Sequence, residues 1–133
     1  MWKLGDFDAY RMQDEVIVGY TAHYASPEVA KAVIEGGSAS AHPAMDIFSL
    51  GLVALEMLRG APLIPASSSK EEALRTLGGD GLEARLREAM EPLPPQLTVL
   101  LKKMLPISPA ERKPAVDLKN SSVLTGNVRG PLP

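Results

Sequence analysis

The sequence contains no cysteine, which excludes disulfide bonds and thiolate metal sites. Its two histidines, His23 and His42, lack the spacing of a zinc-binding motif, so a structural zinc site is not expected. No apolar run approaches the roughly 18 residues that a membrane span needs. The first residues also lack the charged and apolar regions of a secretory signal. These absences favour an intracellular, cytoplasmic protein that does not act at a membrane.

The sequence also lacks any block of basic residues. Its net charge is -2 and no Lys/Arg cluster appears locally, so a nucleic-acid partner is not expected. Hydrophobic residues, in contrast, make up 45% of the 133 positions. A chain of this length and composition has enough apolar side chains for the core of one domain.

The most apolar stretch of the chain covers residues 46–59. Apolar side chains recur almost all the way round a helical projection of this stretch, which is typical of a helix inside a protein. Pro43 and Asp46 mark its start, and Gly60 follows its end. The pattern predicts a buried core helix. The carboxylates of Asp46 and Glu56 must then either find hydrogen-bonding partners or lie away from the buried faces of the helix.

The remaining patterns predict several shorter helices and two short strands. Helices are expected over residues 27–34, 70–77, 82–90, 96–105 and 115–118, separated by Pro and Gly residues. Strands are expected over residues 2–4 and 16–18. The predicted fold is therefore mainly α, a helical bundle around one central buried helix. It carries a short N-terminal strand-and-loop region, and residues 125–133 are expected to form a flexible tail.

Four motifs occur in an order that is more specific than any one of them alone. They are Lys3-Leu-Gly-Asp-Phe7, Tyr24-Ala-Ser-Pro-Glu28, Asp46-Ile-Phe-Ser-Leu-Gly51, and Leu101-Lys-Lys-Met-Leu105 followed by Pro-Ala-Glu-Arg112. The series resembles the second half of a eukaryotic-type protein kinase catalytic domain, from the metal-binding Asp-Phe-Gly motif to the last helices. The resemblance implies a kinase C-lobe-like bundle and a partial kinase domain over residues 1–124, with an activation segment near its N-terminus.

The resemblance also implies positions for the ligands of the reaction. Asp6 resembles the aspartate that binds the magnesium ion bridging the ATP phosphates. Tyr20 and Thr21 lie where the activation-segment loop receives the residue after the phosphoacceptor, and Thr21 supports a Ser/Thr kinase. Glu56 lies where some kinases hold an arginine of the peptide substrate, and a structural role for Glu56 is the alternative.

Further residues take structural positions of the family. Glu28 resembles the glutamate that pairs with a distant arginine, here Arg112, and so ties the activation segment to the last helices. Asp46 resembles the helix aspartate that hydrogen-bonds the backbone of the catalytic loop. Phe48 stands where the family usually has tryptophan.

Two further departures from the family bear on catalysis. Asp8 replaces the glycine of the metal motif and adds a charge there. Nothing in the 133 residues matches the Gly-rich loop, the ATP-binding lysine, its partner glutamate or the His-Arg-Asp catalytic loop. The chain alone is therefore expected to bind no Mg-ATP and to transfer no phosphate.

Two functions are compatible with these departures. In the first, the chain is part of a Ser/Thr protein kinase domain, and the complete parent uses Mg-ATP to phosphorylate proteins. Its partner is then the remainder of the kinase domain. In the second, the chain derives from a pseudokinase and acts as a non-catalytic scaffold or subunit that binds a protein partner.

Overall fold

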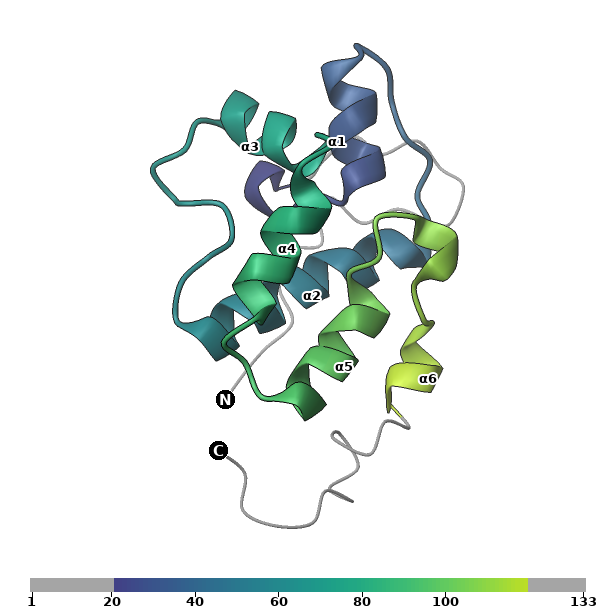
Figure 1. Cartoon of the computed structure of the whole chain (residues 1–133). Helices are drawn as coiled ribbons and strands as arrows, with labels where there is room; N and C mark the ends of the chain where they lie inside the picture. Colours follow the sequence, from purple (N-terminus) through teal and green to yellow (C-terminus); the bar gives the residue numbers. More distant parts are fainter. Residues whose placement is uncertain (1–20, 120–133) are drawn as a thin grey trace, which may run out of the picture.

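A computed structural model describes residues 21–119 of the chain, and these residues form a mainly helical bundle (Figure 1). In chain order the helices are α1 (Pro27–Ile34), α2 (Pro43–Arg59), α3 (Lys70–Leu77), α4 (Leu82–Met90), α5 (Pro95–Met104) and α6 (Ala115–Lys119). Two short 3-10 helices, η1 (Ala22–Tyr24) and η2 (Pro109–Glu111), precede α1 and α6. Residues 21–119 contain no strand, and none of their helices has the length and apolar character to cross a membrane.

The mainly α bundle expected from the sequence is confirmed. The expected strands at residues 2–4 and 16–18 and the expected tail at 125–133 lie outside the described residues. The helices α1, α3 and α4 occupy the predicted ranges, and the predicted bounds of α5 and α6 differ from the structure by one residue. Local signals account for this agreement: Ser69, for example, caps α3 by accepting a hydrogen bond from the Glu72 N–H at 3.1 Å.

The long helix α2 begins three residues earlier than the apolar run does. Its first residue is Pro43, and His42 precedes it as the N-cap. The His42 Nδ1 accepts a hydrogen bond from the Ala44 N–H at 3.1 Å, a role that small polar residues more often take. Gly60 ends the helix with φ of 79°, a left-handed conformation that glycine adopts without strain.

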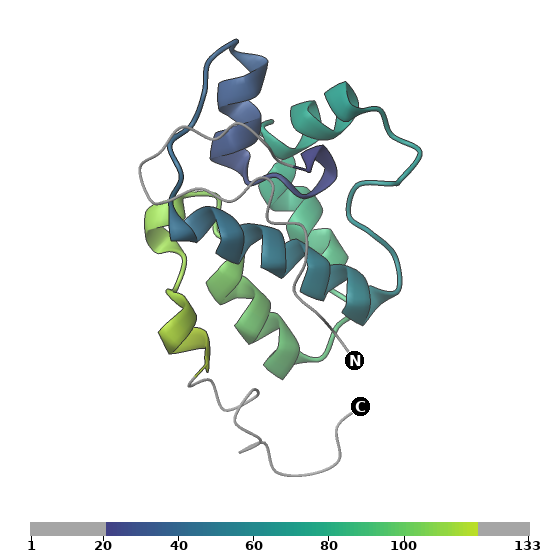
Figure 2. The same cartoon turned by 180° about the vertical axis from the view of Figure 1, so that it is seen from behind.

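The helices pack in two groups around one core. Helix α1 lies against α3, while α5 lies against α2, as both views of the molecule show (Figures 1 and 2). Leu52, Leu55, Leu77 and Leu101 are almost fully buried between these elements. At Gly51 the approach of α2 to the end of α5 is so close that an added Cβ would lie 2.7 Å from Leu105 Cδ2 and 3.1 Å from Met104 Cβ. A side chain at position 51 would therefore force the neighbouring Leu105 and Met104 side chains to shift.

The expectation that α2 is buried all round is wrong. Ile47, Phe48, Leu52 and Leu55 face the core, but the opposite side carries exposed apolar residues: Leu50, Val53, Met57 and Leu58. Met57 is 67% exposed and Leu50 is 55% exposed. Asp46 is exposed as well, so its carboxylate needs no buried partner. Within the described residues, too few elements surround α2 to cover its whole circumference.

Candidate functional site

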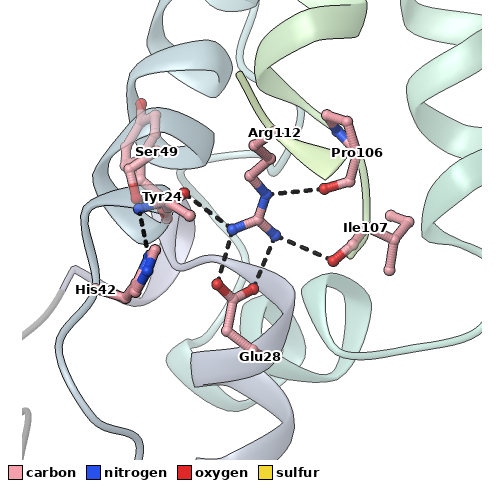
Figure 3. Close-up of polar contacts among 8 residues, drawn as sticks. Tyr24, Glu28, His42, Ser49, Pro106, Ile107 and Arg112 are labelled. Atoms are coloured by element: carbon pink, nitrogen blue, oxygen red, sulfur yellow. Dashed lines mark hydrogen bonds and ion pairs between the residues drawn. The ribbon is translucent and has the colours of Figure 1, made fainter. Parts of the chain in front are cut away.

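A single arginine joins the beginning and the end of the described fold. Arg112 follows η2, and its guanidinium reaches the Glu28 carboxylate in the first turn of α1 (Figure 3). Nη1 lies 2.7 Å from Glu28 Oε2 and Nη2 lies 2.8 Å from Oε1. This is a two-pronged pair, the geometry in which a planar guanidinium binds a carboxylate most strongly.

The remaining guanidinium N–H groups donate to three backbone carbonyls. Nε donates to Pro106 O at 2.9 Å, Nη1 to Ala44 O at 2.9 Å and Nη2 to Ile107 O at 3.1 Å. All five donors of the arginine are thus satisfied, although its side chain is fully buried. A buried cation is tolerated only when its hydrogen-bonding capacity is used in this way. We call Arg112, Glu28 and these three carbonyls the arginine junction.

The aromatic ring of Phe48 completes the junction on its apolar side. The guanidinium carbon of Arg112 lies 4.8 Å from the centroid of this ring, which is completely buried in α2. A cation over an aromatic face at this distance is attracted by the electron-rich face of the ring. The junction therefore connects α1, the first turns of α2 and the segment after α5 through one side chain.

A second contact ties the 3-10 helix η1 to the far part of α2. The Tyr24 hydroxyl donates a hydrogen bond to the Glu56 carboxylate, and both side chains are half-buried. Ser49 Oγ donates to the Tyr24 carbonyl at 2.7 Å. The hydrogen bond to Glu56, with smaller effects of burial and of the negative charge of Glu56, raises the pKa of Tyr24 above its usual value near 10. The η1 segment is thereby held to α2 at two points.

A histidine links η1 to the loop between α2 and α3. His23 Nε2 lies 2.9 Å from the Ser68 carbonyl, so it donates to that oxygen in the tautomer that carries a proton on Nε2. The loop and η1 are therefore fixed relative to each other, although 45 positions separate the two residues.

The structure brings together only some of the residues singled out in the sequence. Glu28, Arg112 and Phe48 meet in the junction, and Glu56 accepts a hydrogen bond from Tyr24. Thr21 is exposed, and its carbonyl accepts a hydrogen bond from the Tyr24 N–H at 3.0 Å.

Two of the expected ligand-binding residues are not among those that the structure describes. Asp6 and Tyr20 lie outside the described residues. Among residues 21–119 there is no group of three or more His, Asp or Glu side chains that could hold a metal ion.

Sequence reasoning missed the hydrogen bonds made by Tyr24, His42 and Ser49. One signal was available: Glu56 interrupts an apolar helix, and a carboxylate in such a place needs a donor. The tyrosine of the Tyr-x-Ser-Pro-Glu motif can supply that donor. No local pattern pairs Glu56 with Tyr24, however, because the two residues are 32 positions apart in the sequence.

The fold and the arginine junction together define a helical bundle in which an acidic helix start is anchored to a distant arginine. Comparison with known families gives the same result. The model of the protein kinase domain family matches residues 1–124. The chain therefore belongs to the protein kinase domain family.

A solved structure of the twitchin kinase region from C. elegans resembles this fold. The two chains share 21% sequence identity, with a TM-score of 0.59. The match covers 84% of this chain and 18% of the chain in that structure, so the present chain spans less than a fifth of the length of that solved chain. At this identity the likeness concerns the fold alone. No match was found among the curated proteins.

Proposed function

We propose that the chain is the C-lobe part of a Ser/Thr protein kinase domain whose complete form transfers the γ-phosphate of ATP to protein substrates. The observation that carries the proposal is the arginine junction, because it joins the Ser-Pro-Glu motif to the segment after α5 within a chain of the kinase family. The proposed partner of the chain is the remainder of the kinase domain.

The described contacts suit a segment that must present a protein substrate. The Glu28–Arg112 pair fixes the start of α1, and the Tyr24–Glu56 hydrogen bond fixes η1 directly before it. Thr21 precedes η1 and is exposed, so a substrate can reach it while the backbone behind it stays anchored. In this proposal Tyr20 and Thr21 receive the residue after the phosphoacceptor. Glu56 acts mainly through Tyr24, and its role toward a substrate arginine remains the alternative.

Asp6 is the proposed magnesium ligand, on the ground of its position in the Lys-Leu-x-Asp-Phe motif. A bound magnesium ion would neutralise the charge of the ATP phosphates during transfer. The described residues offer no carboxylate cluster of their own, so the nucleotide site needs Asp6 together with groups that these 133 residues do not contain.

A peptide phosphorylation assay tests this proposal. The chain is joined to the kinase-domain segment that carries the Gly-rich loop and the catalytic loop, and the wild type is compared with Asp6→Ala. Loss of a metal ligand should lower the rate at least a hundredfold, whereas Arg75→Ala on the exposed face of α3 should leave the rate unchanged. Equal rates for the wild type and Asp6→Ala would contradict the magnesium role.

The second candidate is a pseudokinase-derived scaffold or subunit that binds a protein partner without catalysis. The replacement of the motif glycine by Asp8 favours it. Under this alternative, Mg-ATP produces no thermal shift in the completed domain. A saturable shift would favour the catalytic proposal instead.

A further inference from the structure

The N-cap of α2 is a histidine, whose ring can accept a hydrogen bond only while it is neutral. His42 Nδ1 accepts the Ala44 N–H at 3.1 Å, so this nitrogen carries no proton and the ring holds its proton on Nε2. The Ala44 N–H is one of the first amides of the helix, which have no carbonyl partner within the helix itself. Ala44 is buried, whereas His42 is exposed and can take up a proton from solvent.

Protonation of His42 removes this acceptor. In an imidazolium ion both ring nitrogens are donors, so no rotation of the ring can restore the hydrogen bond. The N-terminus of a helix also repels a cation, because its unpaired N–H groups give it a partial positive charge. Asparagine and serine, the more usual caps, keep an acceptor oxygen when the pH falls. The start of α2 therefore depends on the pH in a way that an ordinary cap does not.

Ala44 connects this cap to the arginine junction. Its N–H donates to His42, and its carbonyl accepts from Arg112 Nη1 at 2.9 Å (Figure 3). The same Nη1 lies 2.7 Å from Glu28 Oε2. A shift of Ala44 after loss of the cap would thus move an oxygen that helps to satisfy a fully buried guanidinium.

The charged groups on the elements around the start of α2 do not hold the His42 ring. These groups are Asp46 in α2, Glu28 and Lys31 in α1, Lys102 and Lys103 at the end of α5, and Glu111, Arg112 and Lys113 at η2 and directly after it. Among residues 21–119 no carboxylate forms an ion pair with His42, and that of Glu28 is bound by Arg112. A proton on His42 therefore meets no counter-charge that already contacts the ring.

We propose that His42 makes the start of α2 sensitive to acid, and that Ala44 passes this effect to the arginine junction. His23 provides an internal contrast. Its Nε2 lies 2.9 Å from the Ser68 carbonyl, and a ring that takes up a second proton on Nδ1 keeps this hydrogen bond. Acid therefore removes the contact of His42 and leaves that of His23. The proposal concerns the fold and does not depend on phosphoryl transfer.

Thermal unfolding of the 133-residue chain at pH 8 and at pH 5 tests the proposal, because histidine side chains ordinarily take up a proton within this range. The wild type is compared with His42→Asn, which keeps a capping oxygen but does not titrate, and with His23→Gln, which keeps a donor. On acidification the melting temperatures of the wild type and His23→Gln should fall by about 4–8 °C more than that of His42→Asn. Equal losses in the wild type and His42→Asn, or a gain in the wild type through a new pair with Asp46, would overturn the proposal.

Nitrogen-15 NMR of the wild type provides a second measurement that needs no variant. At pH 8 the ring of His42 should show an unprotonated Nδ1 and a protonated Nε2. As the pH falls, the resonance of the Arg112 Nε–H should shift with the same midpoint as the His42 ring. A ring that carries its proton on Nδ1 at pH 8, or an Arg112 resonance that does not follow the ring, would contradict the proposal.

Discussion

Glu28 and Arg112 form a two-pronged ion pair although 84 positions separate them in the chain. The arginine side chain is fully buried, whereas the glutamate side chain is 23% exposed. The pair thus lies at the edge of the core, with its cation inside. Removing the carboxylate would leave that cation without a counter-charge in a dry site, which is far more costly than loss of an exposed pair.

We expect Glu28→Gln and Arg112→Ala each to lower the free energy of unfolding by about 3–5 kcal/mol, the usual effect of removing one partner of a buried pair. Urea denaturation followed by circular dichroism measures the change. The matched control is Arg75→Ala, whose pair with Glu71 is about 70% exposed on both sides and should contribute less than about 1 kcal/mol. A loss at Arg112 no larger than at Arg75 would contradict the structural role of the junction.

The raised pKa of Tyr24 predicts a specific loss of stability at alkaline pH. The hydrogen bond to Glu56 favours the neutral phenol, so the pKa of Tyr24 in the folded chain lies above its value near 10 in the unfolded chain. Its contribution to stability is therefore fully present below about pH 10 and is lost as the pH rises through the raised value. The wild type should lose stability more steeply than Tyr24→Phe above pH 10. Parallel pH profiles of the two proteins would show that the hydrogen bond to Glu56 does not couple to folding.

Replacing Gly51 by a larger residue tests the packing of α2 against α5, because helix propensity and overpacking change stability in opposite directions. Alanine favours a helix over glycine by about 1 kcal/mol, but its Cβ would overlap the buried Leu105 and Met104 side chains. Overpacking of a tight core costs about 1–3 kcal/mol, so Gly51→Ala should be destabilising or neutral and Gly51→Val clearly destabilising. Gly81→Ala is the control, because no atom lies within 4 Å of a Cβ added there. A gain in melting temperature for Gly51→Val would contradict the close approach of α2 and α5.

Two serines at helix starts should respond to alanine in opposite ways. Ser26 is 1% exposed, and its Oγ has no hydrogen-bond partner among the described residues. Removing such a buried unpaired hydroxyl should raise stability by about 1 kcal/mol. Ser69 Oγ caps α3, so Ser69→Ala should lower stability by about 1 kcal/mol. Melting temperatures that shift in the same direction for both variants would contradict this assignment of the two hydroxyls.

Helix positions were largely predictable because their signals are local. Proline at first turns, glycine after last turns and apolar spacing of three and four residues placed α1, α3 and α4 at their observed bounds. Pro43 also marked the start of α2, whereas its cap was not foreseen because histidine is an uncommon N-cap residue.

Tertiary burial was less predictable than helix positions. An apolar run does not reveal how many other helices pack against it. Whether Leu50 and Met57 are buried or exposed depends on those neighbouring elements and not on the run itself. Likewise, the Glu28–Arg112 contact followed from a family resemblance, since no local pattern connects residues so far apart. The three carbonyl oxygens that complete the arginine junction are backbone atoms. Their positions depend on the backbone conformation, so the identity of the side chains does not predict them.

The arginine junction also bears on the order in which the fold is completed during synthesis. Glu28 and the Ala44 carbonyl leave the ribosome well before Arg112, so both wait for a cation that is made near the end of the described chain. The contacts of Arg112 with Glu28 in α1 and with the Ala44 carbonyl in α2 therefore form only after η2 has been synthesised. A nascent chain that ends after α5 holds most of the apolar core but lacks the side chain that joins α1 to α2, and partly folded species of this kind are prone to aggregation.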